Sequence, residues 1–214
     1  MDDEQTPART VTRLSDPKAL RAYAHPVRMK LIVALRTRGP LTATQAGRLL
    51  GESSGTCSFH LRQLAKYGLV EETGGGTGRE KPWRATALFT AWDDLPADPE
   101  AAAAARELTE VTAREYFAEL TRWLERRSGE REEWQRAAFF GDRFFWVTAD
   151  ELAEVGRELL AVTDKYLERL VKPELRPPGA RLATYLHLGF PDMTLPDTPS
   201  SDTPDGDTPD GDTP

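Results

Sequence analysis

Hydrophobic residues recur at helical spacing in four short, successive segments near the start of the chain. The first segment covers residues 17–23, and the second starts at Pro26, a residue that favours the first turn of a helix. In the second segment the apolar positions i, i+4, i+7 and i+8 share one face: Val27, Leu31, Ala34 and Leu35. Gly39 and Pro40 interrupt the pattern. The chain is therefore predicted to begin with two short helices.

A third helix is predicted over residues 42–50, with Thr42 as its N-cap. Its inward positions would be Ala46, Leu49 and Leu50. Gly51 follows immediately and supplies the backbone freedom that a tight turn needs. This short helix and its turn would lead directly into the next helix.

A fourth helix is predicted from an N-cap at Ser53 or Ser54 to about Tyr67, and its two faces differ in chemistry. One face is apolar and points inward: Cys57, Leu61, Leu64 and Ala65. The opposite face carries two cations and an aromatic ring among polar residues: Gly55, Thr56, Phe59, Arg62, Gln63 and Lys66. Such an outward face is suited to contact a partner.

Two strands are predicted after the fourth helix, over residues 69–73 and 80–86. Residues 74–78 between them are almost all glycine, which indicates a mobile hairpin tip. The order of helix, turn, helix and hairpin predicts a winged helix-turn-helix domain over residues 15–92. Residues 1–14 have no clear period and are expected to form a flexible arm.

The remainder of the chain is predicted to be mainly helical. A long helix over residues 98–127 carries an apolar stripe, and a second over 148–171 begins with a capping box of Thr148 and Glu151. Residues 143–148 are predicted to form a strand, and alternating residues predict a second strand at 181–189. Residues 192–214 repeat Asp-Thr-Pro and are expected to be disordered. The expected fold is mainly α with small β: a winged helix-turn-helix domain, a long dimerisation helix and a helical C-terminal extension with a short β element. Residues 98–191 would form the dimerisation and possible effector region.

Charge is divided unevenly along the chain, whose net charge is -7. Between Pro17 and Trp92 there are twelve Lys or Arg and four acidic residues, so this segment carries +8 and the remainder -15. This division predicts a module that faces phosphate, attached to a part with another role. The acidic total therefore does not argue against a nucleic-acid partner.

The sequence predicts a cytoplasmic protein. No apolar run approaches the ~20 residues of a membrane span, and the acidic N-terminus lacks the features of a signal peptide. Cys57 is the single cysteine, which excludes an internal disulfide and clustered-cysteine zinc sites. No phosphate loop, nucleophile elbow or His/Asp constellation is present, so no catalytic residue, cofactor or enzymatic activity is expected.

The fourth helix and the hairpin hold the candidate DNA-binding residues, because a helix fits the major groove and an extended cationic arm can follow phosphates. Phe59 could contact a thymine methyl or pack under the hairpin, and Trp83 is expected to be a core anchor. The predicted contacts to double-stranded DNA are Ser54, Thr56, Ser58, Phe59, His60, Arg62, Gln63, Lys66, Arg79, Lys81 and Arg84.

The segment 24–32 (AHPVRMKLI), followed by 58–70 (SFHLRQLAKYGLV), resembles the arsenical-repressor (ArsR) family of bacterial winged helix regulators. Residues 78–83 (GREKPW) look similar to the wing of a longer, actinobacterial-type branch of that family with a C-terminal extension. The resemblance implies a homodimer that binds an inverted-repeat operator and represses until an effector binds. It also implies dimer contacts from the first helix and from the helix after the wing.

The chain departs from the metal-sensing members of that family. Residues 44–48 (TQAGR) replace their paired-cysteine box, and residues 98–127 contain neither His nor Cys. Cys57 and His60 stand at i and i+3, but two ligands make a poor metal site. The expected trigger is therefore a non-metal small-molecule effector, or no small ligand, and no metal site is predicted.

Aromatic residues crowd one part of the C-terminal region: Trp134, Phe139, Phe140, Phe144, Phe145 and Trp146. They could line an effector pocket or simply form core. The main alternative to DNA binding is a protein-interaction module that uses the winged helix as a scaffold. The basic face with Arg62 and Arg79 favours DNA.

Overall fold

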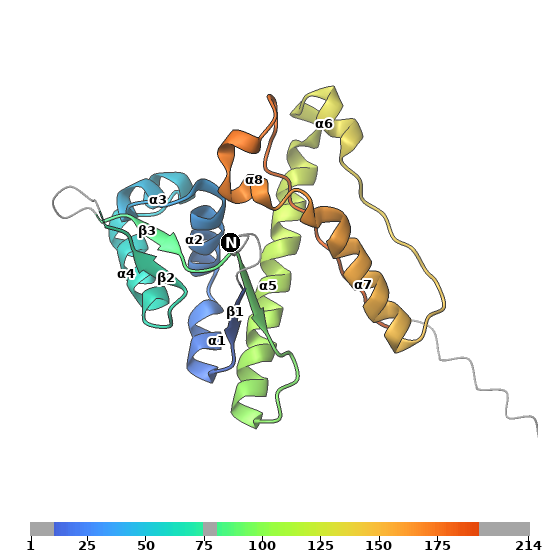
Figure 1. Ribbon diagram of the computed structural model, residues 1–214, viewed down its shortest axis with the longest axis horizontal. Helices are drawn as coiled ribbons and strands as arrows, with labels where there is room; N and C mark the ends of the chain where they lie inside the picture. Colours follow the sequence, from blue (N-terminus) through green and yellow to red (C-terminus); the bar gives the residue numbers. More distant parts are fainter. Residues whose placement is uncertain (1–10, 75–80, 193–214) are drawn as a thin grey trace, which may run out of the picture.

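The structure is a computed structural model that describes residues 11–74 and 81–192. Helices predominate in it, and Figure 1 shows the shorter ones grouped beside the long helix α5. The N-terminal elements are β1 (Val11–Leu14), α1 (Pro17–Tyr23), α2 (Pro26–Arg38), α3 (Ala43–Leu50), α4 (Ser54–Ala65), β2 (Val70–Glu72), β3 (Trp83–Ala85) and β4 (Phe89–Trp92). The C-terminal elements are α5 (Pro99–Arg126), η2 (Arg127–Gly129), α6 (Glu132–Ala137), α7 (Ala149–Asp164), α8 (Glu168–Val171) and η3 (Pro173–Leu175). The expected fold class is confirmed.

Local capping residues set the bounds of the helices around the turn. Thr42 Oγ1 accepts from the Gln45 amide at 3.2 Å, and Gln45 Oε1 accepts from the Thr42 amide at 2.8 Å, which completes a capping box. Gly51 ends α3 with φ at 71°, a left-handed conformation that favours glycine. These interactions are local, so the start of α3 and the turn after it followed from the sequence.

The predicted hairpin forms as an antiparallel pair of β2 and β3, in which Val70 lies opposite Ala85 and Glu72 opposite Trp83. The observed strands are shorter than predicted, and of the glycine-rich tip predicted at residues 74–78 only Gly74 lies within the described residues. Trp83 also exchanges backbone hydrogen bonds with Leu41, which ties the hairpin to the loop before α3. The wing is thereby fixed beside the helix-turn-helix.

The second pair of strands was not predicted. β1 pairs in parallel with β4, with Leu14 opposite Trp92. The expectation of a flexible arm through residue 14 is therefore wrong for Val11–Leu14. The strand escaped notice because only Leu14 among its residues is buried, so no alternation marks it, and because its partner lies far away in the sequence.

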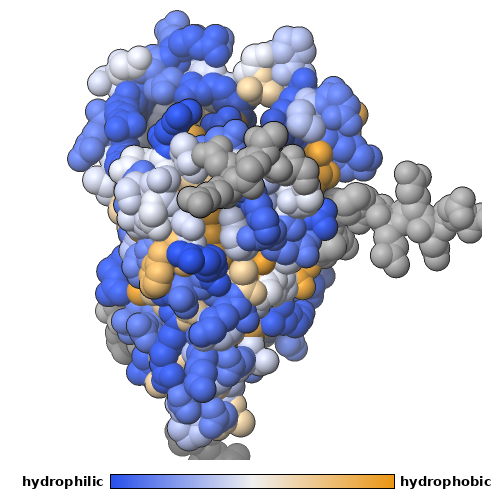
Figure 2. Space-filling model, turned by 90° about the vertical axis from the view of Figure 1, so that its left-hand side faces the viewer, coloured by the Kyte–Doolittle hydropathy of each residue, from blue (hydrophilic) through white to orange (hydrophobic). Residues whose placement is uncertain are grey.

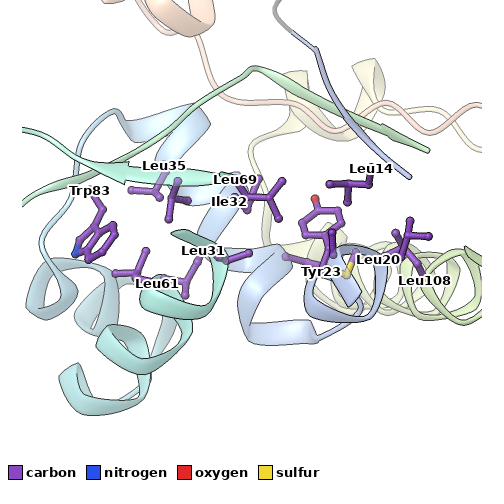
Figure 3. Packing of buried hydrophobic residues seen from close by; sticks show 14 of the residues in the cluster. Leu14, Leu20, Tyr23, Leu31, Ile32, Leu35, Leu61, Leu69, Trp83 and Leu108 are labelled. Atoms are coloured by element: carbon purple, nitrogen blue, oxygen red, sulfur yellow. The ribbon is translucent and has the colours of Figure 1, made fainter. Parts of the chain in front are cut away.

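One hydrophobic core joins the helix-turn-helix to the first half of α5 (Figure 3). Leu31, Ile32, Leu61 and Leu64 are fully buried, and Trp83 is buried as a core anchor, as predicted. From α5 the core receives Ala104, Ala105 and Leu108. Leu49 is exposed rather than inward, which corrects the prediction, because α3 buries little beyond Ala46 and Gly47.

The C-terminal region differs most from its prediction. Residues 143–148 and 181–189 form no strand, and the expected helix over 148–171 is interrupted between α7 and α8. The predicted capping box of Thr148 and Glu151 is present. Most of the crowded aromatic residues are exposed, so they form neither a core nor an enclosed pocket. Alternation alone does not make a strand, because a strand also needs a neighbour and a covering layer.

Candidate nucleic-acid interface

The helix α4 is held by its N-cap and by its apolar face. Ser53 Oγ accepts from the Thr56 amide at 2.9 Å, while Cys57, Leu61 and Leu64 are completely buried. α4 packs mainly on α3 and also on α2. Burial of one face fixes the rotation of the helix, so the opposite face points to solvent, as the sequence predicted.

The outward face of α4 presents donors and one ring. Phe59 is 52% exposed, so it is not covered by the hairpin, and that alternative is wrong. Arg62 is exposed and donates from Nε to the Ser58 carbonyl at 3.2 Å. Ser54 and Lys66 are exposed, and Thr56, Ser58 and Gln63 are half-buried. Figure 2, which views the molecule from the side of α4 and the wing, shows a mainly hydrophilic surface. This face is polar and cationic, with a single aromatic ring.

His60 differs from the other predicted contacts because it is only 8% exposed. Its ring lies 4.5 Å from the ring of His25, the N-cap of α2, and His60 Nδ1 is buried without a hydrogen-bond partner in the described residues. Burial lowers the pKa of both imidazoles, and the charge of Arg28 lowers both further. His60 therefore packs α4 against α2 and does not reach outward.

This pair of imidazoles predicts that stability falls in mild acid. Because the folded-state pKa of both imidazoles is lowered, the unfolded chain binds more protons, and stability is lost as pH falls from about 7 towards 5. His60→Gln should flatten this dependence, since it removes one titrating group. Urea unfolding at both pH values measures the effect, and identical pH dependence in the two proteins would contradict it.

The cations of the wing are held in ion pairs across the hairpin. Lys81 Nζ lies 2.8 Å from Glu72, and Arg84 donates to Glu71 Oε1 at 2.7 Å. The bond to Glu72 raises the pKa of Lys81. All four side chains are exposed, so these pairs exchange readily with other anions. These two ion pairs were not predicted from the sequence, because they depend on the register of β2 and β3. Arg79, predicted as a contact, lies outside the described residues.

An open cleft of about 340 Å³ lies between α3, α4 and the wing. Arg62 and Lys81 line it, together with Ser54 and Ser58 from the first turns of α4 and Thr42 from the N-cap of α3. Helix N-termini and these donors favour an anion such as phosphate, while the carboxylate of Glu72, which also lines the cleft, is neutralised by its ion pair with Lys81. Thr42 was predicted only as the N-cap of α3. The position of Thr42 in a polar cleft depends on the tertiary structure.

Cys57 and the metal-ligating side chains are poorly placed for redox or metal chemistry in the part of the chain that the structure describes. Cys57 is completely buried, and its burial raises the pKa of the thiol, which disfavours the reactive thiolate. No group of three His, Cys, Asp or Glu side chains comes together as a metal site within residues 11–74 and 81–192. In the same described ranges, no helix is both long and apolar enough to cross a membrane.

The helices α3 and α4, the turn between them and the β2–β3 hairpin together define a DNA-binding winged helix-turn-helix domain, the class used in transcription regulation. Residues 23–73 match the family model of a helix-turn-helix domain. This segment includes α2, α3, α4 and β2. No curated protein matches the chain.

Several solved structures are distantly similar to the chain. The PcaV transcriptional regulator from Streptomyces coelicolor is 18% identical, with 65% of this chain and 74% of that chain covered and a TM-score of 0.30. Wild-type MarR from E. coli is 16% identical, with coverage of 69% and 87% and a TM-score of 0.30. The regulator Tm0710 from Thermotoga maritima is 13% identical, with coverage of 71% and 89% and a TM-score of 0.28.

Proposed function

We propose that the chain is a sequence-specific transcriptional regulator of the ArsR type, acting in the cytoplasm as a repressor. α4 would enter the major groove, and the wing would follow phosphates or the minor groove. The observation that carries the proposal is the outward face of α4, where Phe59, Arg62 and Gln63 project from a helix whose other face is completely buried. Arginine and glutamine recognise base edges, and an exposed ring suits a thymine methyl.

The proposal includes a homodimer on an inverted-repeat operator. The second half of α5 leaves Phe117 and Leu124 53% and 47% exposed, although both belong to the predicted apolar stripe. Covering this stripe with the same stripe of a second copy would form a two-fold dimer. The two α4 helices would then address half-sites about 34 Å apart, one turn of DNA.

A non-metal small molecule is proposed as the trigger that releases the operator. In metal-sensing relatives, the helices that correspond to α3 and α5 carry the metal ligands. In this chain α3 has no cysteine, and α5 has neither His nor Cys. Cys57 is buried, and this burial raises the pKa of its thiol, so the thiolate form that binds a metal is disfavoured.

The test is a gel-shift assay with purified full chain and the DNA upstream of its own coding region. Specific binding should be lost steeply as salt rises, because neutralising phosphates releases counterions. Failure to shift any fragment at low salt, with a folded dimer confirmed by sedimentation, would refute the proposal.

The ion pairs of the wing allow a prediction in the direction of tighter binding. Glu71→Gln with Glu72→Gln frees Arg84 and Lys81 for phosphate and removes two negative charges from the hairpin. We expect affinity for all DNA sequences to rise by about three- to tenfold, with a steeper dependence on salt. Titration over a range of salt concentrations measures both quantities, and unchanged affinity would show that the hairpin does not approach phosphate. Glu158→Gln with Glu154→Gln in α7 is the charge-matched control.

The same ion pairs favour one alternative function, a protein-interaction module. A wing whose Lys81 and Arg84 are already neutralised by Glu72 and Glu71 offers no free cation at these two positions. If this alternative holds, freeing the two cations would leave DNA binding unmeasurable. The glutamine variants therefore separate the two functions.

A further inference from the structure

The C-terminal extension exposes many aromatic side chains. Residues 139–147, here called the aromatic segment, run in extended form from α6 to the start of α7 (Figure 1). Their rings lie largely in solvent: Phe139 and Phe144 are 80% exposed, Phe140 76%, Phe145 53% and Trp146 90%. These residues are apolar, yet nothing in the described chain covers them.

A second extended stretch, residues 181–190 or the return segment, adjoins the first. The rings of Phe139 and Tyr185 lie 6.3 Å apart between centroids, so the two segments meet at this point. The return segment adds exposed Leu182, Tyr185, Leu188 and Phe190. Within the described residues, neither segment makes a backbone hydrogen bond to another strand. The exposed apolar side chains and the backbone of the two segments therefore lack the partners of a folded interior.

The exposed area is too large for the surface of an isolated monomer. At roughly 150–250 Å² for each aromatic side chain, the two segments together expose on the order of 1,000 Å² of apolar surface. The largest apolar patch of a typical monomer is about 300–600 Å². A stable protein interface needs about 800 Å² from each partner. The summed exposed area of the two segments exceeds the largest apolar patch of a typical monomer, and it is enough for one side of a stable interface.

The rest of the printed sequence cannot provide this cover. Outside the described ranges its large apolar side chains are only Met1, Met193 and Leu195. A small-molecule occupant is also disfavoured, because ligand sites are concave and enclose most of their ligand, whereas three of these rings are at least 80% exposed. A macromolecule with a comparable apolar surface is the partner that suits these rings.

A second copy of the chain meets this requirement. It brings an aromatic surface of the same size, and the aromatic segment is electrically neutral because Asp142 is followed by Arg143. In a two-fold arrangement Asp142 can approach the partner's Arg143 without repulsion between the segments. The return segment is also anchored to α5, through Thr184 and Glu119 at 3.0 Å, so the surface is attached to the helix that carries the proposed dimer stripe.

We propose that the aromatic and return segments form a second homodimer interface, in which the extension of one copy packs against the extension of the other. This interface rests on the homodimer of the proposed function but not on DNA binding. It makes the extension a stabiliser of the dimer rather than an effector pocket. The backbone of the two segments gains hydrogen-bond partners, and the exposed rings become buried.

Sedimentation of the full chain over roughly nanomolar to micromolar concentrations tests the inference. The first variant is Phe140→Ser with Phe144→Ser and Trp146→Ser, and the second is Phe117→Ser with Leu124→Ser in α5. Leu95→Ser is the matched control, because Leu95 is 88% exposed and lies in neither surface. We expect the dimer dissociation constant of the first variant to rise at least about a hundredfold, as for central aromatic contacts, and that of the control to stay unchanged.

The outcomes separate this inference from the proposed function. If the wild-type chain is a monomer, both the second interface and the proposed homodimer are refuted. If the α5 variant dissociates and the aromatic variant does not, only the second interface is refuted. Weakening of the dimer in the aromatic variant, with or without weakening in the α5 variant, supports it.

Hydrogen exchange of the wild-type protein provides a readout that needs no substitution. Amides of residues 139–147 should exchange at least about tenfold more slowly at a concentration where the chain is dimeric than at one where it is monomeric. Unprotected exchange of this segment in the dimer would overturn the inference. Circular dichroism of each variant checks its helices, which the exposed substitutions should leave unchanged.

Discussion

Gly47→Ala is expected to lower the free energy of unfolding by about 2 to 3 kcal/mol, as overpacking of a tight site does. Gly47 lies in α3 where the chain turns back towards α4, and it is buried. An added Cβ would meet the Glu52 carbonyl oxygen at 2.7 Å and the Ser54 amide at 3.3 Å. Both are backbone atoms, so no flexible side chain can yield. α3 and α4 would have to separate, and the outward face of α4 would move with them.

Urea unfolding followed by circular dichroism measures this effect, with Gly156→Ala as the matched control. Gly156 lies within α7, and an added Cβ there meets no atom within 4 Å. Alanine is the better helix former, so this control should gain up to about 1 kcal/mol rather than lose stability. Equal stability of wild type and Gly47→Ala would show that α3 and α4 need not approach as closely as they do.

The helix-turn-helix was predictable because short-range interactions define it. The N-cap of α3 at Thr42, the turn at Gly51 and the glycine-rich hairpin connection are each visible within a few residues. The apolar face of α4 likewise follows from helical spacing alone. The importance of Gly47 was not visible, because its lack of a side chain matters only when α4 returns against α3. A close approach of this kind depends on tertiary structure.

The parts that could not be predicted depend on distant partners. β1 exists because β4 lies beside it, about 78 residues further along the chain. The aromatic segment is rich in residues that favour strands, yet the described residues of one copy supply neither a neighbouring strand nor a cover. If the second interface forms, the expected strands at 143–148 and 181–189 would describe the dimer better than the single chain.

The outward residues of α4 were predicted from the sequence, whereas the arrangement of the cations in the β2–β3 wing was predicted only in part. Helical spacing identified Phe59, Arg62 and Gln63 as outward residues, and the structure agrees. His60 is buried because it lies on the flank of α4 that meets His25, a contact between separate helices. The pairing of Arg84 with Glu71 follows from strand register, which the sequence did not determine.

Arg62→Ala is expected to weaken specific DNA binding by about ten- to a hundredfold, the range for loss of a good arginine contact to a base. Arg62 is exposed at the cleft between α3, α4 and the wing, and its Nε bond to the Ser58 carbonyl holds the guanidinium there. Arg157→Ala in α7 removes the same charge away from the interface and is the control. Its affinity should stay close to that of the wild type.

Gln63→Ala separates base recognition from phosphate attraction, because this substitution removes donors without changing charge. If Gln63 reads a base edge, binding to the preferred site falls by about tenfold while affinity for unrelated DNA and the dependence on salt remain the same. Arg62→Ala, by contrast, also reduces the salt dependence if its guanidinium contacts phosphate. Competition titrations against a library of altered sites measure both effects. Equal losses of affinity from both variants on every DNA sequence would mean that α4 contacts only the DNA backbone and that specificity comes from another element. A change of preferred base at one position would place Gln63 in the groove.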